Sequence, residues 1–528
     1  MSSLQETPTY PIWNRIGLRP HFGVALPLSA LHSQKSCGIG EFLDLLPLID
    51  WCQEVKMDVI QLLPLNDTGQ DPSPYNAISS KALSPLFLSL HALPWLDQSP
   101  LETKLKEMQA LNSSSKVAFS EVRTEKMLFL SAYYECYQEQ LLSLPGYQEF
   151  IDQNAWIKPY ALFKVLKDKT GQVHYLFWPG EYKDLSPASL KPLYDKYAKE
   201  LSFYCLLQYL CYLQLTRVKQ IANQQGILLK GDIPILISPD SADVWSEPEF
   251  FNLELSAGAP PDLYNPQGQY WGFPIFHWDA MKKSGFSWWK AKLAYAGHFY
   301  DLYRMDHVLG LFRLWAIPPG LAADKGWFIP SEESLWGLRA EELLQVLIAS
   351  SPMLPIAEDL GTVPPIVRPT LEKFGLCGTK VLRWERHWEG DGSFIDPASF
   401  SPLSMTCLST HDSPTLEQWW RDFPKEAKVY ALQKNWTYSP KITHEQRIDF
   451  LIRSHQSQSL FHINLLSEYL ALVPELVSSN PDEERINIPG TINASNWTYR
   501  FRRSIEEIAQ NAFLKKEMQK ITWSKRTD

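Results

Sequence analysis

The sequence has few cysteines and no metal-binding spacing of cysteine or histidine. Only 7 of its 528 residues are cysteine, an odd number without a C-x-x-C pair, and its 12 histidines form no H-x-H or H-E-x-x-H motif. Scattered thiols of this kind are typical of a reducing compartment and argue against a disulfide framework or a zinc site. We therefore expect a cytoplasmic protein that needs no metal and no cofactor.

The sequence also lacks a surplus of positive charge and any long apolar segment. Its 50 Lys and Arg are outnumbered by 59 Asp and Glu, giving a net charge of −9. Such a balance disfavours nucleic acid and anionic membrane surfaces as partners. No run of about 18 apolar residues is present to form a transmembrane helix, and the first residues, MSSLQETPTYPIW, have no secretory-signal pattern. We expect an uncharged partner, with no nucleic acid and no membrane.

Aromatic residues are abundant, with 20 Trp, 23 Tyr and 25 Phe. Several tryptophans lie in Pro- and Gly-rich segments with polar neighbours: Trp178, Trp245, Trp271, Trp278, Trp315 and Trp327. Any one of them could be a core residue or a loop anchor. Together, flat apolar faces beside Asp, Asn and Gln suit a sugar, which has C–H faces and hydroxyl edges. The Trp288, Trp289 pair on an expected helix is interpreted as core rather than as a remote glycan patch.

Eight short apolar runs, each ending in a polar cluster, alternate with helical patterns. The runs cover residues 21–31, 57–67, 226–235, 300–308, 353–361, 378–386, 404–415 and 485–490. Nearly continuous apolar strands are expected when both faces of a parallel sheet are buried. The alternation predicts an α/β fold, a (β/α)8 TIM barrel.

The spacing of these runs predicts insertions at the carboxyl ends of the strands, where such a barrel builds its active site. We expect strands 1 and 2 in residues 1–67, a mostly α-helical insertion in 68–225, and strand 3 in 226–237. A Pro-, Gly- and aromatic-rich lid region is expected in 238–285. Residues 286–528 then hold the rest of the barrel and one closing C-terminal helix, with no C-terminal β-sandwich.

Three acidic residues close strand-like runs four, five and seven: Asp306, Glu358 and Asp412. A single strand-end Asp is more often a helix N-cap or a surface partner, but three together at the carboxyl ends of barrel strands indicate a catalytic site. Retaining cleavage of a glycosidic bond needs two carboxyl groups about 5 to 5.5 Å apart.

Their neighbours suggest different roles for the three acids. Arg304 shares a strand face with Asp306 and would hold it ionised, as a nucleophile requires. Glu358 has Asp359 beside it and no basic residue in its run, which favours a protonated acid. Asp412, next to His411, could oppose the charge of an oxocarbenium-like transition state.

Several motifs occurring in one order resemble a known family. They are SPYNAISSKALSPLFLSL (73–90), GDIPI (231–235), GAPPDLYNPQGQYWG (258–272), RMDH (304–307), AEDLG (357–361), GTKVLRW (378–384), STHD (409–412) and INIPGT (486–491). The chain resembles the amylomaltases, the 4-α-glucanotransferases or disproportionating enzymes of glycoside hydrolase family 77. The resemblance implies transfer of α-1,4-glucan or glucosyl units between malto-oligosaccharides with retention, and no requirement for a metal.

The resemblance also assigns individual residues. It implies that Asp306 is the nucleophile, Glu358 the general acid/base and Asp412 the transition-state stabiliser. Sugar contacts around the cleaved linkage are implied for Tyr75, Asp232, Arg304 and His411. Neighbouring subsites are implied for Ser73, Asp262, Gln269 and Trp271, the last three on a lid loop.

Two positions depart from the bacterial pattern. Phe273 stands where bacterial members usually carry a sugar-binding Asn, and Leu309 stands where they carry an Arg. Both features are similar to the plant cytosolic disproportionating enzyme, which passes glucose from maltose to a branched glycan. The expected partners are therefore malto-oligosaccharides, maltose, and glycogen or another branched glucan. The alternatives are a maltodextrin hydrolase with the same site and a non-catalytic glycan-binding barrel.

Overall fold

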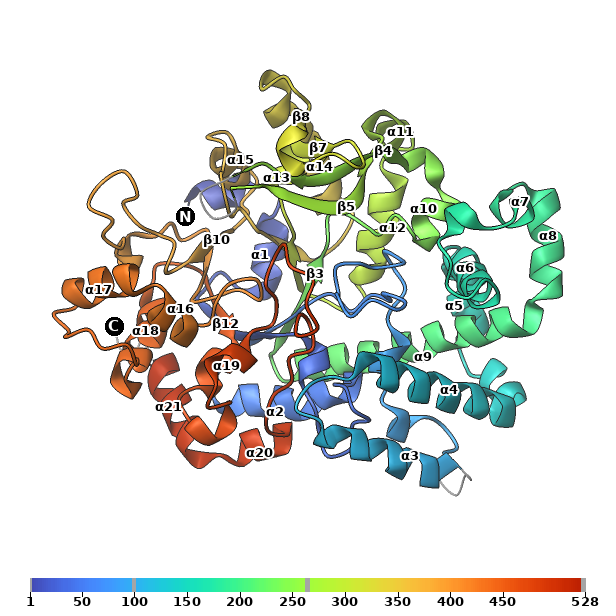
Figure 1. The fold of residues 1–528 in the computed structure, drawn as a ribbon, viewed down its shortest axis with the longest axis horizontal. Coiled ribbons are helices and arrows are strands. Elements are labelled where there is room, and N and C mark those ends of the chain that lie inside the picture. Colours follow the sequence, from blue (N-terminus) through green and yellow to red (C-terminus); the bar gives the residue numbers. More distant parts are fainter. Residues whose placement is uncertain (1, 97–100, 262–265, 524–528) are drawn as a thin grey trace.

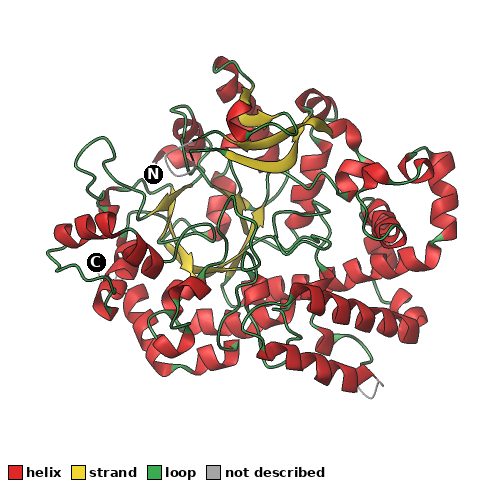
Figure 2. Cartoon of the chain, viewed as in Figure 1, coloured by secondary structure: helices red, strands yellow, loops and turns green. Residues whose placement is uncertain are grey.

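The fold is a closed barrel of eight parallel strands, seen in a computed structural model that describes residues 2–96, 101–261 and 266–523 (Figures 1 and 2). The strand order is β10-β11-β12-β1-β2-β3-β6-β9. A parallel bridge between Ile356 and Cys377, where Ala357 N donates to Cys377 O at 2.7 Å, joins the two ends of the sheet. The barrel strands are β1 (His21–Leu26), β2 (Val59–Leu62), β3 (Leu228–Ile233), β6 (Leu302–Met305), β9 (Leu354–Ala357), β10 (Gly378–Val381), β11 (Ser404–Cys407) and β12 (Phe461–Leu465). The predicted (β/α)8 barrel is confirmed.

Helices surround the barrel and cover the outer faces of its strands (Figure 2). They are α1 (Tyr10–Ile16), α2 (Leu45–Glu54), α12 (Ser287–Ala296), α14 (Ser334–Ala349), α15 (Val367–Lys373), α16 (Leu416–Asp422), α17 (Pro424–Gln433) and α18 (His444–Gln456). Trp288 and Trp289 on α12 are only 1% and 4% exposed. Their interpretation as core residues is confirmed.

The eighth strand is not where the sequence predicts it. Residues 485–490 form a loop, and the eighth strand is β12. The sequence pattern does not predict this strand, because His462 and Asn464 alternate with its apolar residues. Both side chains are nevertheless fully buried in the barrel wall. Burial is possible because each is hydrogen-bonded: Asn464 Oδ1 accepts from Leu408 N at 2.8 Å, and His462 Nδ1 lies 2.8 Å from Ser454 O.

A helical segment fills the long connection between β2 and β3, drawn in blue-green on the right of Figure 1. Its helices are α3 (Leu101–Gln109), α4 (Phe119–Leu142), α5 (Tyr147–Gln153), α6 (Ile157–Lys169), α7 (Gly180–Lys183), α8 (Pro187–Lys196) and α9 (Ala198–Gln224). The last helix, α9, buries an apolar stripe that includes Leu207, Cys211 and Leu215. It runs directly into β3.

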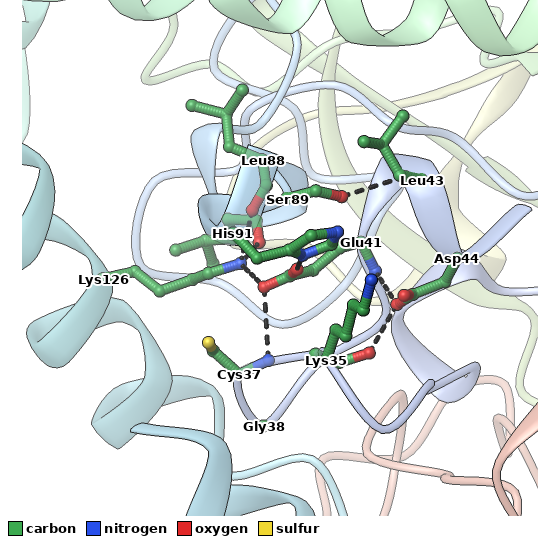
Figure 3. Close-up of polar contacts among 12 residues, drawn as sticks. Lys35, Cys37, Gly38, Glu41, Leu43, Asp44, Leu88, Ser89, His91 and Lys126 are labelled. Carbon is green, nitrogen blue, oxygen red and sulfur yellow. Dashed lines mark hydrogen bonds and ion pairs between the residues drawn. The ribbon is translucent and has the colours of Figure 1, made fainter. Parts of the chain in front are cut away.

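A buried ion pair fastens this helical segment to the loop that follows β1 (Figure 3). Lys126 on α4 donates to Glu41 Oε1 at 2.6 Å and to the carbonyl oxygens of Leu86 and Leu88 at 2.6 and 2.9 Å. Both charged side chains are fully buried. Burial raises the pKa of Glu41 to about 8, although Lys126 opposes that rise. The pair therefore joins α4 to the barrel, and each buried charge is stabilised by the other.

A second, four-stranded antiparallel sheet lies across the barrel, at the top of Figure 1. Its strand order is β5-β4-β7-β8, from β4 (Phe251–Ala259), β5 (Gln269–Phe276), β7 (Leu314–Ile317) and β8 (Trp327–Ile329). Short helices border it: α10 (Ala242–Ser246), α11 (Trp278–Lys283) and α13 (Leu309–Phe312). Part of the expected lid region thus forms regular strands.

After β12, the described residues up to 523 form only helices and loops. The helices are α19 (Leu466–Leu470), α20 (Ile505–Gln510) and α21 (Ala512–Trp523). The prediction of one closing helix is wrong, because the chain turns at Asn511, between α20 and α21. Among the described residues, no helix is long and apolar enough to cross a membrane.

Candidate active site

One arginine at the end of β6 contacts three carboxylates. Arg304 Nη1 lies 2.7 Å from Asp306 Oδ1 and 3.0 Å from both carboxylate oxygens of Asp232. Its Nη2 lies 3.7 Å from Glu358 Oε2. The guanidinium therefore brings together side chains that follow β6 and β9 with one at the end of β3.

The register of the barrel explains this meeting. Parallel pairing places Asp232 beside Arg304 and Met305 beside Ala357. The next residues, Asp306 and Glu358, consequently leave the barrel side by side, and Glu358 N donates to Met305 O at 3.0 Å. Carboxyl ends of barrel strands are where active sites form in this fold.

Glu358 is placed to hold a proton at neutral pH. Burial raises its pKa to about 8, the positive charge of Arg304 opposes that rise, and the negative charge of Asp306 adds to it. The backbone N–H of His307 donates to Oε2 at 2.7 Å. The negative charge of the neighbouring Asp359 also raises the pKa of Glu358, but by a smaller amount. Its carboxylate accepts from Thr379 N at 2.6 Å.

Asp412, in the loop after β11, is held in the charged form. Burial by itself would raise its pKa, but His411 and a hydrogen bond from Asn487 lower it to about 2. His411 Nε2 lies 3.3 Å from Asp412 Oδ2, and Asn487 Nδ2 donates to Oδ1 at 2.6 Å. Arg485 donates to the Asp412 carbonyl oxygen at 2.9 Å.

Asn487 and Arg485 are not among the residues predicted from the sequence, because the sequence pattern predicts a barrel strand in residues 485–490. A signal was present, since Pro489 removes a ladder donor and makes a central strand there unfavourable. Instead the segment folds over the β11 loop, where Asn487 N donates to His411 O at 3.1 Å.

Aromatic rings form one wall of the site. Tyr75 stacks on His411 with ring centroids 5.2 Å apart, and its hydroxyl donates to Asp232 Oδ2 at 2.8 Å. Trp497 lies 5.6 Å from Tyr75 and 5.8 Å from His411. Nothing in the local sequence pattern singled out Trp497, which reaches the site only because the C-terminal loop folds back.

The antiparallel pair β4–β5 supplies a further aromatic side chain from another side of the site. Trp271 packs edge-to-face on His307 at 4.9 Å, and its indole N–H donates to Gln269 Oε1 at 3.0 Å. Because His307 directly follows Asp306, Trp271 and His307 border the carboxylate cluster. Phe273, further along β5, is half-buried against the core.

Ser73 and Leu309 make no hydrogen bond with the three carboxylates of the cluster. Ser73 shares the loop of Tyr75, and its backbone N–H donates to Asp71 Oδ1 at 2.8 Å. Leu309 is buried in α13, 8% exposed. Asp262 lies outside the described residues.

The cluster has the composition of an acid–base site. It combines a carboxyl group that stays protonated at neutral pH, Glu358, with Asp412, which is ionised, and with Asp306, which faces a guanidinium. In the described part of the chain, no group of three or more His, Cys, Asp or Glu residues is placed to hold a metal ion. This set can protonate a leaving oxygen while a second carboxylate attacks from the other side.

Comparisons with known proteins agree on one family. A family model described as 4-alpha-glucanotransferase matches residues 26–506. A Chlamydia pneumoniae protein named 4-alpha-glucanotransferase is 46% identical over 508 residues, covering 96% of each chain. The rice protein 4-alpha-glucanotransferase DPE2 is 23% identical over 657 residues, covering 95% of this chain and 69% of its own.

A solved structure shares the fold. The amylomaltase from Streptococcus agalactiae, solved in complex with acarbose, superposes with a TM-score of 0.82 at 23% identity. The match covers 96% of this chain and 99% of that one. At this identity the similarity establishes the architecture of the barrel and its insertions.

Proposed function

Because the chain belongs to the 4-alpha-glucanotransferase family, glycoside hydrolase family 77, we propose that its transfer reaction uses Asp306, Glu358 and Asp412. The observation that supports this assignment is the position of Arg304, whose guanidinium contacts Asp306 and Glu358 together. Two carboxyl groups that share one guanidinium lie within reach of a single glycosidic linkage.

In the first step, Asp306 attacks the anomeric carbon of an α-1,4-linked glucose unit. The bond to the leaving oxygen breaks, and Glu358 gives its proton to that oxygen. A covalent glycosyl ester on Asp306 remains, and the shortened glucan departs with a free 4-hydroxyl. The raised pKa of Glu358 supplies the proton at neutral pH.

In the second step, the 4-hydroxyl of another sugar takes the place of the departed fragment. Glu358, now a carboxylate, removes the hydroxyl proton while the oxygen attacks the anomeric carbon and Asp306 leaves. The α-linkage is restored. Asp412, ionised beside His411, stabilises the positive charge that develops on the ring in both transition states.

A transferase must favour a sugar acceptor over water. The rings of Tyr75, Trp497 and Trp271 border the carboxylates on two sides. Flat apolar surfaces there would bind the C–H face of an acceptor and limit access of water to the ester. The substrates we propose are malto-oligosaccharides and maltose, with glycogen or another branched glucan as acceptor.

Phe273 is the residue we propose to affect the choice of donor, since the family resemblance implies a sugar-binding Asn at this position in bacterial members. Tyr75, Asp232, Arg304 and His411 would contact the sugar at the cleaved linkage, and Ser73, Asp262, Gln269 and Trp271 would line adjacent subsites. A cytoplasmic location stays a prediction from the cysteine content.

Incubation of the purified protein with maltotriose tests the reaction. A transferase produces glucose together with a ladder of longer maltodextrins, without an increase in total reducing ends. A maltodextrin hydrolase produces only shorter sugars and increases the number of reducing ends. A glycan-binding barrel leaves maltotriose unchanged. Asp306→Asn serves as the inactive control, and either of the last two outcomes in the wild type would refute transfer.

A further inference from the structure

A cleft of about 580 Å³ lies between the helical segment and the barrel, and Asp306, Glu358 and Asp412 are not among its lining residues. Its walls come from the junction of α5 and α6, from α10 and from α12, which are neighbours in Figure 1. The cleft thus separates the helical segment from the barrel. Ligand sites are common at such junctions, and this volume is within the usual range of roughly 300 to 1,000 Å³.

Small side chains keep the cleft open. Ser287, Ala291 and Ala294 lie along one face of α12, at the three- and four-residue spacing that aligns side chains on a helix. Ala155 and Ala242 narrow the opposite walls only slightly. Large residues at these positions would fill the space between the two parts of the chain.

The deeper charges of the cleft are already paired. Lys81 Nζ lies 3.6 Å from Asp243 Oδ1, which also accepts from Trp288 Nε1 at 2.8 Å. Ser80 N donates to Asp243 Oδ2 at 3.0 Å. A ligand would therefore meet a neutral pair at the base of the cleft.

One carboxylate of the lining remains unpaired. Glu247, at the end of α10, lines the cleft, and its carboxylate makes no hydrogen bond or ion pair with any residue of the described chain. Burial raises the pKa of Glu247, and the charge of Lys81 opposes that rise. Because Lys81 is paired with Asp243, the described lining carries a net negative charge when Glu247 is ionised. Burial lowers the pKa of His298, so this lining residue is neutral at pH 7. Phosphate and carboxylate ligands are disfavoured by this charge.

An aromatic ring and amide groups complete the wall. Trp156 is half-buried in the lining, 5.0 Å from the ring of Tyr295. Its indole N–H donates to Asn154 Oδ1 at 3.1 Å, and Gln153 precedes this pair. A flat ring, amide edges and a free carboxylate are the groups that bind the C–H face and hydroxyl edges of a sugar.

We propose that this cleft is a second glucan-binding site, in which Trp156 stacks on a glucose ring and Glu247 accepts hydrogen bonds from its hydroxyl groups. The choice of a glucan rests on the proposed function. Two parts of the cleft wall are connected in sequence to the active site. Ser79 and Lys81 follow Tyr75 in one loop, and α10 follows the strand that holds Asp232.

A second point of attachment would favour long or branched substrates. Binding one branch in the cleft raises the effective concentration of the same molecule at the carboxylates. Maltotriose is too short to occupy two separate sites at once. The cleft should therefore discriminate between polymeric and short substrates.

The test measures glycogen binding in the Asp306→Asn background, by retardation in native gels that contain glycogen. We expect Trp156→Ala and Glu247→Gln each to weaken binding about fivefold or more. Trp95→Ala is the matched control, because Trp95 is a 46% exposed tryptophan outside the cleft. It should bind glycogen like its parent.

Kinetics of the same substitutions in the active enzyme provide the second readout. For Trp156→Ala and Glu247→Gln, kcat/KM should fall at least about fivefold more with glycogen as acceptor than with maltotriose. Parental glycogen binding, or equal losses on both substrates, would overturn the second site. Gel retardation measures binding without turnover. If the wild type has no transferase activity, the proposed function is refuted, but the binding measurements still test the second site.

Discussion

Arg304, in β6, reaches forward to Asp306, the residue that follows this strand, and Arg304 Nη1 donates to Asp306 Oδ1 at 2.7 Å. The guanidinium is itself little exposed, at 12% of its side chain. This contact holds the carboxyl group of Asp306 in a fixed position, as a nucleophile requires. Since the same guanidinium reaches Glu358, it also sets how the two carboxyl groups face each other.

Replacement of either central carboxyl group should nearly abolish transfer. Asp306→Asn removes the nucleophile and Glu358→Gln removes the transferable proton, so we expect each to lower kcat by at least about three orders of magnitude. Maltotriose turnover measures the loss, and calorimetry should still detect sugar binding. Asp324→Asn, a surface substitution, is the control. More than a tenth of wild-type rate in either variant would contradict the assigned roles.

The rate should fall as the pH rises above about 8. The active form of Glu358 is the protonated one, which persists below its pKa of about 8 and is lost above it. The dependence of kcat/KM on pH with maltotriose reports this group in the free enzyme. Asp359→Asn removes a negative charge that raises the pKa of Glu358 and should move the alkaline limb to lower pH. A limb near pH 5 in the wild type would oppose this account.

Asn487 should act through Asp412. Its amide donates to Asp412 Oδ1 at 2.6 Å and lowers the pKa of that carboxyl group. A hydrogen bond to a charged group is worth about 1.5 to 3 kcal/mol, so Asn487→Ala should reduce kcat about tenfold or more and shift the acid limb upward. The control is Asn493→Ala in the same loop, whose side-chain bonds stay within that loop. An equal loss in both variants would indicate a disrupted loop.

Phe273 should influence donor choice. Phe273→Asn replaces a half-buried apolar ring on β5 with a group that can hydrogen-bond a sugar. We expect the ratio of kcat/KM for maltose to that for maltotriose to change severalfold, whereas Phe273→Leu, which stays apolar, should preserve it. An unchanged ratio in the Asn variant would remove Phe273 from donor selection.

The buried Lys126–Glu41 pair should matter for stability. Lys126→Met leaves the fully buried Glu41 carboxyl group without its partner, and removal of one member of a buried pair costs about 3 to 5 kcal/mol. Urea unfolding monitored by tryptophan fluorescence measures the change. Lys104→Met breaks an exposed pair with Glu125, 3.9 Å long, and should cost no more than about 1 kcal/mol. Equal effects of the two substitutions would contradict the buried pair's importance.

The sequence by itself determined the barrel and the family. Short apolar runs located seven of the eight strands, because both faces of a parallel strand are buried and its residues are consequently apolar. It also predicted Asp306, Glu358 and Asp412 as candidate catalytic residues, because residues at the carboxyl ends of barrel strands come after the packed positions. Those signals are local, and a local pattern can be read along the chain.

Only the tertiary structure decided the eighth strand and the partners of Asp412. His462 and Asn464 can be buried in β12 because residues distant in sequence satisfy their polar atoms. Asn487 and Trp497 reach the carboxylate cluster because the C-terminal loop folds back over the barrel mouth. Hydrogen bonds and ring contacts between distant segments leave no periodic trace in the sequence, and so they become visible only when the chain is folded.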